Sequence, residues 1–148
     1  MGTINWSRVF LGGLVWWVVF NVLWIAALVV YLNPEVVAAW KALGLTYSPT
    51  PVVAVFWFAL TFVGGVVAIW LYAAIRPRYG PGPKTAVSVG LAFWFIGEFA
   101  PMMFFGVHGV FPWRFVLMDV ATVLVVVVVA TVAGAWLYRE EESDTPGP

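Results

Sequence analysis

The sequence contains no cysteine, only one histidine, and charged side chains at just 9% of its 148 residues. The absence of cysteine excludes disulfides, thiol redox chemistry, cysteine nucleophiles and Cys-ligated metal or iron–sulfur sites. A soluble domain is typically about a quarter charged, so this chain has too few charged groups to face water on all sides. The formal net charge of +0 provides no basic field, which argues against nucleic acid as a partner.

Apolar residues dominate instead, at 64% of the chain, and the mean hydropathy is +0.99. Four apolar segments each approach the roughly 20 residues that a helix needs to cross a bilayer. The sequence therefore predicts an all-α integral membrane protein, in which residues 1–139 form one domain and residues 140–148 an acidic, disordered cytoplasmic tail. The predicted spans are residues 9–32, 51–75, 86–105 and 115–137.

Three connections separate these spans. Residues 33–50 begin with Asn33-Pro34 and end in a Ser-Pro-Thr-Pro run, which predicts turns at both ends. Between the turns, apolar residues at helical spacing predict a short amphipathic helix lying on the membrane. Residues 76–84 (RPRYGPGPK) favour a non-helical loop, and the short, apolar connection 106–113 predicts a tight hairpin between the last two spans.

Basic residues indicate the orientation. Five fall on the side of the two termini and the second loop, and two fall on the other side. The positive-inside rule then places both termini in the cytoplasm of a multi-pass protein. The five are Arg8, Arg76, Arg78, Lys84 and Arg139, and the two are Lys41 and Arg114.

A weak internal repeat is also present. GLVWWVVFN begins at Gly13 and GLAFWFIGE begins at Gly90, 77 residues apart (13 and 90), and the Trp-Leu-Tyr run at 70–72 recurs at 136–138. This pattern predicts two duplicated helical hairpins related by an axis along the membrane normal. The alternative is chance recurrence in a biased composition. In the repeat, Asn21 occupies the position of Glu98.

Two acids lie inside apolar segments. A carboxylate near the centre of a bilayer costs several kcal/mol unless it is neutral, paired or hydrated. A neutral Glu98 that donates a hydrogen bond to Asn21 would meet this requirement. A hairpin that turns near Gly109 would place Asp119 at a similar depth, with His108 and Arg114 nearer the outer surface.

Three interpretations of this cluster remain open. The first is a polar pocket that handles protons or a ligand through Glu98 and Asp119, with His108 and Arg114 at its mouth. The second, which we favour from sequence, is an interhelical hydrogen-bond clamp in which Asp119 offsets Arg114. The third is an interface with another subunit. His108 taken alone is typical of a hydrated loop residue.

No spacing indicates a metal site with three or four protein ligands, a cofactor motif or a catalytic nucleophile. The sequence therefore predicts a protein without enzymatic activity and without a cofactor.

Short motifs across most of the chain resemble a group of small four-helix bacterial membrane proteins that is catalogued as a domain of unknown function. The resemblance implies a bacterial inner-membrane protein with four spans, and it implies no activity. The residues that carry it are Asn5-Trp6, Trp40-x-x-Leu43-Gly44, Gly90-Leu91-x-x-Trp94, Asp119 and Gly134-x-Trp136.

Two functions follow as hypotheses. The first is a scaffold or accessory subunit of a membrane complex, whose partners are lipid and either further copies of the chain or other subunits. The alternative is a small transporter or ligand-binding membrane protein with a polar intramembrane pocket at Asn21, Glu98 and Asp119.

Overall fold

A computed structural model describes residues 4–139, and the acidic tail predicted for 140–148 lies outside the described residues. The described residues form helices and connections without any β-strand. In chain order the elements are α1 (Trp6–Ala27), the π-helical turn η1 (Leu28–Leu32), α2 (Asn33–Ala42), α3 (Pro51–Tyr79), α4 (Pro83–Trp94), the π-helical turn η2 (Phe95–Phe99), α5 (Ala100–Val107) and α6 (Trp113–Trp136).

These elements make four long helices, because η1 and η2 join their neighbours without a break. Each of the four is long and apolar enough to cross a membrane, which confirms the predicted number of long apolar helices. The second, third and fourth helices agree with the predicted segments to within a few residues. The predicted non-helical loop 76–84 is nevertheless wrong in extent, because α3 continues through Pro77 to Tyr79 and α4 begins at Pro83, which leaves residues 80–82 between them. The four are Trp6–Ala42, Pro51–Tyr79, Pro83–Val107 and Trp113–Trp136.

The first helix differs from its prediction, because no turn occurs at Asn33-Pro34. A proline inside a helix lacks an N–H, and its ring collides with the carbonyl four residues earlier. The wider π-helical turn η1 directly precedes Pro34 and accommodates it, so the chain continues as helix through α2. Val36 and Ala39 of α2 are buried in a cluster with Phe115 and Val116 of α6, so α2 packs against protein as well as presenting exposed apolar residues.

The third helix is built in the same way. The turn η2 directly precedes Pro101 of α5, as η1 precedes Pro34. The two turns lie 67 residues apart (28 and 95), as do the two prolines (34 and 101), whereas the sequence repeat at Gly13 and Gly90 has a spacing of 77. The duplication of two hairpins stays a prediction.

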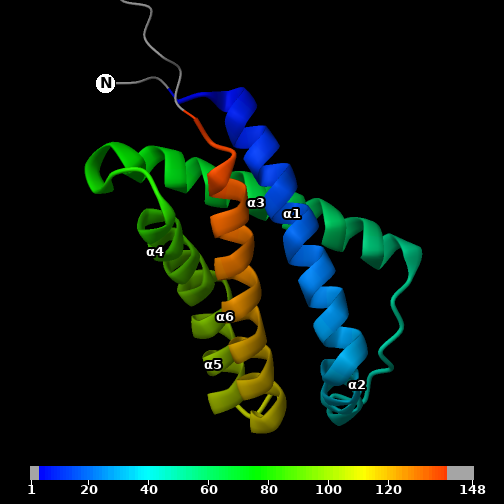
Figure 1. The fold of residues 1–148 in the computed structure, drawn as a ribbon. Coiled ribbons are helices and arrows are strands. Elements are labelled where there is room, and N and C mark those ends of the chain that lie inside the picture. The colour runs from blue at the N-terminus through cyan, green and yellow to red at the C-terminus, as the bar shows by residue number, and fades with distance from the viewer. Residues whose placement is uncertain (1–3, 140–148) are drawn as a thin grey trace, which may run out of the picture.

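α6 is the central helix. It packs against α1 on one side and α4 on the other, and its core residues include Val126, Val127 and Ala130. Trp16 of α1 is almost completely buried, and its indole N–H donates to Thr131 Oγ1 of α6 at 3.0 Å. α3 crosses α1 and α6 at a steep angle (Figure 1).

Glycines permit the closest helix crossings. A Cβ built on Gly134 would lie 2.6 Å from the Gly12 carbonyl oxygen, and a Cβ on Gly65 would lie 2.6 Å from the Gly13 carbonyl oxygen. α1 therefore touches α6 and α3 backbone to backbone at adjacent residues. Small residues at such crossings are how helices associate in lipid, where no hydrophobic force drives them together.

Candidate functional site

The two predicted acids meet across the hairpin formed by the third and fourth helices. Glu98 comes from η2 and Asp119 from α6, and their carboxyl groups are neighbours on the wall of one cavity. Two neighbouring carboxylates repel each other, so one of the two groups retains a proton. The similar depth expected from a symmetric hairpin agrees with this contact.

Asp119 is the more deeply buried of the two acids, with only 5% of its surface exposed. No group in residues 4–139, the Glu98 carboxyl included, donates a hydrogen bond to Asp119 Oδ1, although this atom is buried. Buried polar atoms are satisfied in the great majority of cases. An unsatisfied carboxylate oxygen therefore needs a specific explanation.

A cavity of about 490 Å³ lies beside these acids. Both carboxylic side chains lie on its wall, between apolar residues of α1, α3, α5 and α6. The segment between α2 and α3 also contributes, through Tyr47 and Pro49. Seven aromatic side chains beside that tyrosine line the cavity: Phe20, Trp24, Trp40, Trp57, Phe58, Phe111 and Phe115.

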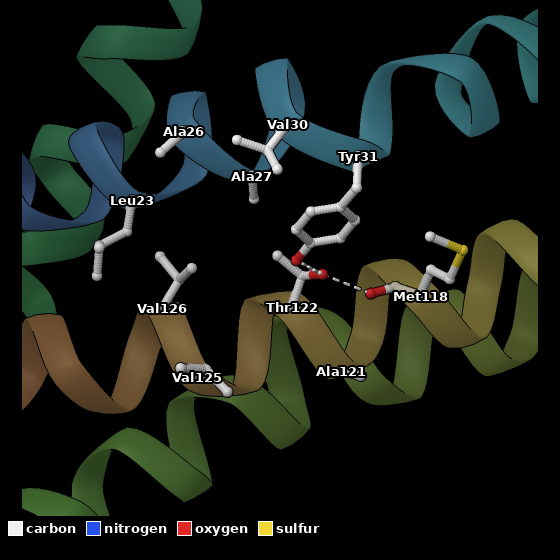
Figure 2. Close-up of a pocket in the computed structure, with 10 residues that line it drawn as sticks. All are labelled: Leu23, Ala26, Ala27, Val30, Tyr31, Met118, Ala121, Thr122, Val125 and Val126. Atoms are coloured by element: carbon white, nitrogen blue, oxygen red, sulfur yellow. Dashed lines mark hydrogen bonds between the residues drawn. The ribbon is translucent and has the colours of Figure 1, made fainter.

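A second hollow is a groove of about 570 Å³ between the first helix and α6 (Figure 2). Its walls are small or branched apolar side chains. The polar groups on its floor satisfy one another, because Tyr31 Oη and Thr122 Oγ1 lie 2.8 Å apart and Thr122 Oγ1 donates to the Met118 carbonyl oxygen at 2.6 Å. The groove therefore lacks the unsatisfied atom that distinguishes the acid-lined cavity.

Asn21 does not pair with Glu98, and the sequence-based expectation of this pair is wrong. Its Nδ2 donates to the Trp17 carbonyl oxygen at 2.8 Å and to Thr61 Oγ1 at 3.1 Å, and its Oδ1 accepts from Trp57 Nε1 at 3.0 Å. α3, which the repeat did not consider, supplies both interhelical partners. Asn21 is thus a satisfied clamp between α1 and α3.

Arg114 does not offset Asp119 either. Its Nε lies 2.9 Å from Glu35 Oε1 of α2, an acid that sequence reasoning did not connect with the site. His108 lies at the hairpin turn, where its exposed ring contacts the Phe104 carbonyl oxygen through Nδ1 at 2.8 Å. Neither Arg114 nor His108 lines the cavity, so its wall carries no basic side chain.

The aromatic walls were also missed from sequence. Trp24 and Trp57 lie together on the cavity wall, with ring centroids 6.0 Å apart. The indole bond from Trp57 to Asn21 fixes one of these rings. No group of three or more His, Asp or Glu side chains within residues 4–139 is arranged to hold a metal ion.

Comparisons with known proteins give no further guidance: no family model, no curated protein and no solved structure matches this chain. The resemblance to the four-helix bacterial group stays a prediction.

Proposed function

We propose that this protein binds a small molecule within the membrane, as a small transporter or ligand-binding protein, and that its site is the cavity at Glu98 and Asp119. The observation that carries the proposal is the buried, unsatisfied Asp119 Oδ1 on the wall of a cavity large enough for a ligand. Pockets for drug-sized molecules typically enclose about 300–1,000 Å³ and combine apolar walls with a few polar groups.

A contrast within the molecule supports ligand binding over a purely structural role for the acids. Asn21 and Asp119 are equally buried, at 5% exposure each. Asn21 has protein partners for both ends of its amide, as a clamp requires. Asp119 leaves one oxygen without a hydrogen bond beside an open space. An unsatisfied oxygen contributes little to holding the helices together, but it is available to interact with a ligand.

The predicted orientation would open the cavity to the outer side of a bacterial inner membrane. Trp40, Tyr47 and Pro49 line it, and they belong to the connection that the positive-inside rule places outside. An aqueous ligand would then reach the acids from the outer side.

Cysteine labelling tests this access, because the chain has no cysteine of its own. Met102 lines the cavity, whereas Ala100, two residues earlier on α5, is exposed on the outer surface of the fold and does not line it. Single cysteines at these positions would be exposed to a membrane-impermeant methanethiosulfonate added outside intact vesicles. Thiols react as thiolates, which form in water and not in lipid, so we expect Met102→Cys to react at least about tenfold faster than Ala100→Cys.

Equal labelling rates at the two positions would contradict the proposal. They would show that the cavity is no more accessible to water than the lipid-facing surface of α5. Labelling of Met102→Cys only from the inner side would retain the site but reverse the orientation.

A second candidate function, the scaffold or accessory subunit, is favoured by the N-terminal half of α3. Almost every residue from 51 to 60 is exposed, on all sides of the helix. A helix segment with so much exposed apolar surface is able to accept another subunit as well as lipid. Purification in a mild detergent tests this candidate: a stoichiometric partner subunit would favour it, and a particle containing only this chain would count against it.

A further inference from the structure

We propose that the ligand of this cavity is a lipophilic organic monocation. This inference rests on the proposed function and specifies the class of molecule that the site binds.

The charge of the acid pair is the first argument. Glu98 and Asp119 are neighbours on the wall of one cavity, where two carboxylates repel each other. One of them therefore retains a proton, and the pair has one net negative charge. No lysine or arginine lines the cavity. A single buried negative charge without a counter-ion is costly in a medium of low polarity, and one monovalent cation neutralises it. An anion would instead face two carboxyl groups.

Neighbouring charged groups do not provide the counter-ion. The guanidinium of Arg114 is bound to Glu35, and Lys41 on the same side of the molecule is exposed. Among residues 4–139, Tyr47 is the only other titratable residue on the cavity wall, and Tyr31 contacts Thr122 in the separate groove. The acid pair is therefore the charged group that a ligand meets inside.

The aromatic walls are the second, independent argument. The faces of tryptophan, tyrosine and phenylalanine attract cations, most strongly where water is excluded. Trp24 and Trp57 form one ring pair on the wall, and Trp40 and Tyr47 form a second pair, with ring centroids 5.8 Å apart. Walls of this kind also accept the apolar bulk of a ligand, so the positive charge belongs on a molecule that is otherwise hydrophobic. A small hydrated metal ion has no such bulk.

Tetraphenylphosphonium and tetraphenylborate provide a matched pair of probes, because they have nearly the same shape and opposite charges. Binding to the purified full-length protein in mild detergent would be measured by calorimetry, with empty micelles as the blank. We expect tetraphenylphosphonium to bind at least about tenfold more tightly than tetraphenylborate, since an interaction with a charged partner is worth about that factor or more. Lowering the pH would weaken this binding, because a second proton removes the charge of the pair.

Four variants identify the site of binding. Glu98→Gln and Asp119→Asn each leave one carboxylate and one hydrogen-bond donor, so each keeps one negative charge and is expected to bind the cation within about threefold of the wild type. The double variant has no charge and is expected to bind at least about tenfold more weakly. Trp24→Leu keeps the acids and removes one aromatic face, and is expected to weaken cation binding by about threefold or more. Thermal unfolding of each variant checks that it is folded, and Trp24→Leu provides the test if the double variant is not.

The outcomes separate this inference from the proposed function. Equal binding of both probes, or unchanged cation binding in the double variant, would overturn the monocation and leave the cavity as a site for another ligand. Binding of neither probe, together with rapid labelling of Met102→Cys, would overturn only the inference. Slow labelling of Met102→Cys would overturn the proposed function itself.

Discussion

At the scale of single residues, burial does not distinguish structural from functional polar groups, whereas hydrogen-bond satisfaction does. Asn21, Thr131 and Asp119 are all buried. The first two have specific interhelical partners, Trp57 and Thr61 for Asn21 and Trp16 for Thr131. Asp119 has only another acid. Apolar substitutions at Asn21 and Thr131 should therefore lower stability, whereas an apolar substitution at Asp119 should raise stability and weaken ligand binding.

Replacement of Asn21 by leucine is expected to destabilise the protein by about 1 kcal/mol, because two interhelical hydrogen bonds are lost and each is worth about 0.6 kcal/mol in a membrane protein. Denaturation with SDS in mixed micelles would measure the change. Trp57→Phe removes only one of the two bonds and should cost about half as much. A leucine variant as stable as the wild type would show that the clamp contributes nothing.

Replacement of Asp119 by leucine is expected to raise stability by about 1–2 kcal/mol, because a buried charged group with incomplete partners is often less stable than an apolar side chain. Cation binding should weaken by about tenfold, because leucine, unlike asparagine, offers the remaining Glu98 carboxylate no hydrogen-bond donor. Thr131→Val is the control: it removes the acceptor of the Trp16 indole and should lower stability by up to about 1.7 kcal/mol. If Asp119→Leu were as destabilised as Thr131→Val, Asp119 would instead be a structural clamp.

At the scale of elements, two prolines determine the shape of the first and third of the four long helices. Each follows a π-helical turn, and Glu98 lies inside one of these turns. A π-helical turn changes the direction in which its side chains point, and such turns occur frequently at functional sites. Pro101 therefore favours the π-helical turn η2, and η2 directs the Glu98 side chain toward α6.

Pro101→Ala is expected to allow η2 to relax toward a regular α-helix, because the clash with the carbonyl of residue 97 disappears. Stability should be unchanged or higher, while Glu98 turns away from Asp119 and cation binding falls by about tenfold. Pro34→Ala is the matched control, since it relieves the same strain in η1, away from the acids. Equal ligand binding by both variants would show that η2 does not position Glu98.

At the scale of the whole molecule, hydropathy and length predicted the number of spans and most of their boundaries. The hairpin pattern also predicted the proximity of Glu98 and Asp119. The sequence did not reveal that α6 is central or that α3 crosses the other helices steeply, because hydropathy does not specify which helix faces meet in lipid. For the same reason, the partner of Asn21 was predicted to be Glu98 of the third span, whereas its partners lie on α3, the second span. The aromatic cavity was not predicted either.

The arrangement of the whole molecule depends on backbone contacts at glycines, and two adjacent residues of α3 test this. A Cβ at Gly65 would lie 2.6 Å from the Gly13 carbonyl oxygen, whereas a Cβ at Gly64 would lie 3.7 Å from Phe93 Cζ, an ordinary contact. Gly65→Ala must separate α3 from α1 and is expected to lower stability by on the order of 2 kcal/mol. Gly64→Ala should raise stability by about 0.5–1 kcal/mol, because alanine favours the helix.

Unfolding of both variants in the same detergent would measure the difference. A Gly65→Ala variant as stable as Gly64→Ala would mean that α1 and α3 are not in backbone contact. Because Trp57 and Phe58 of α3 form part of the cavity wall, separation of α3 from α1 should also disturb the site. Gly65→Ala is therefore expected to weaken tetraphenylphosphonium binding by about tenfold, and Gly64→Ala to leave it unchanged.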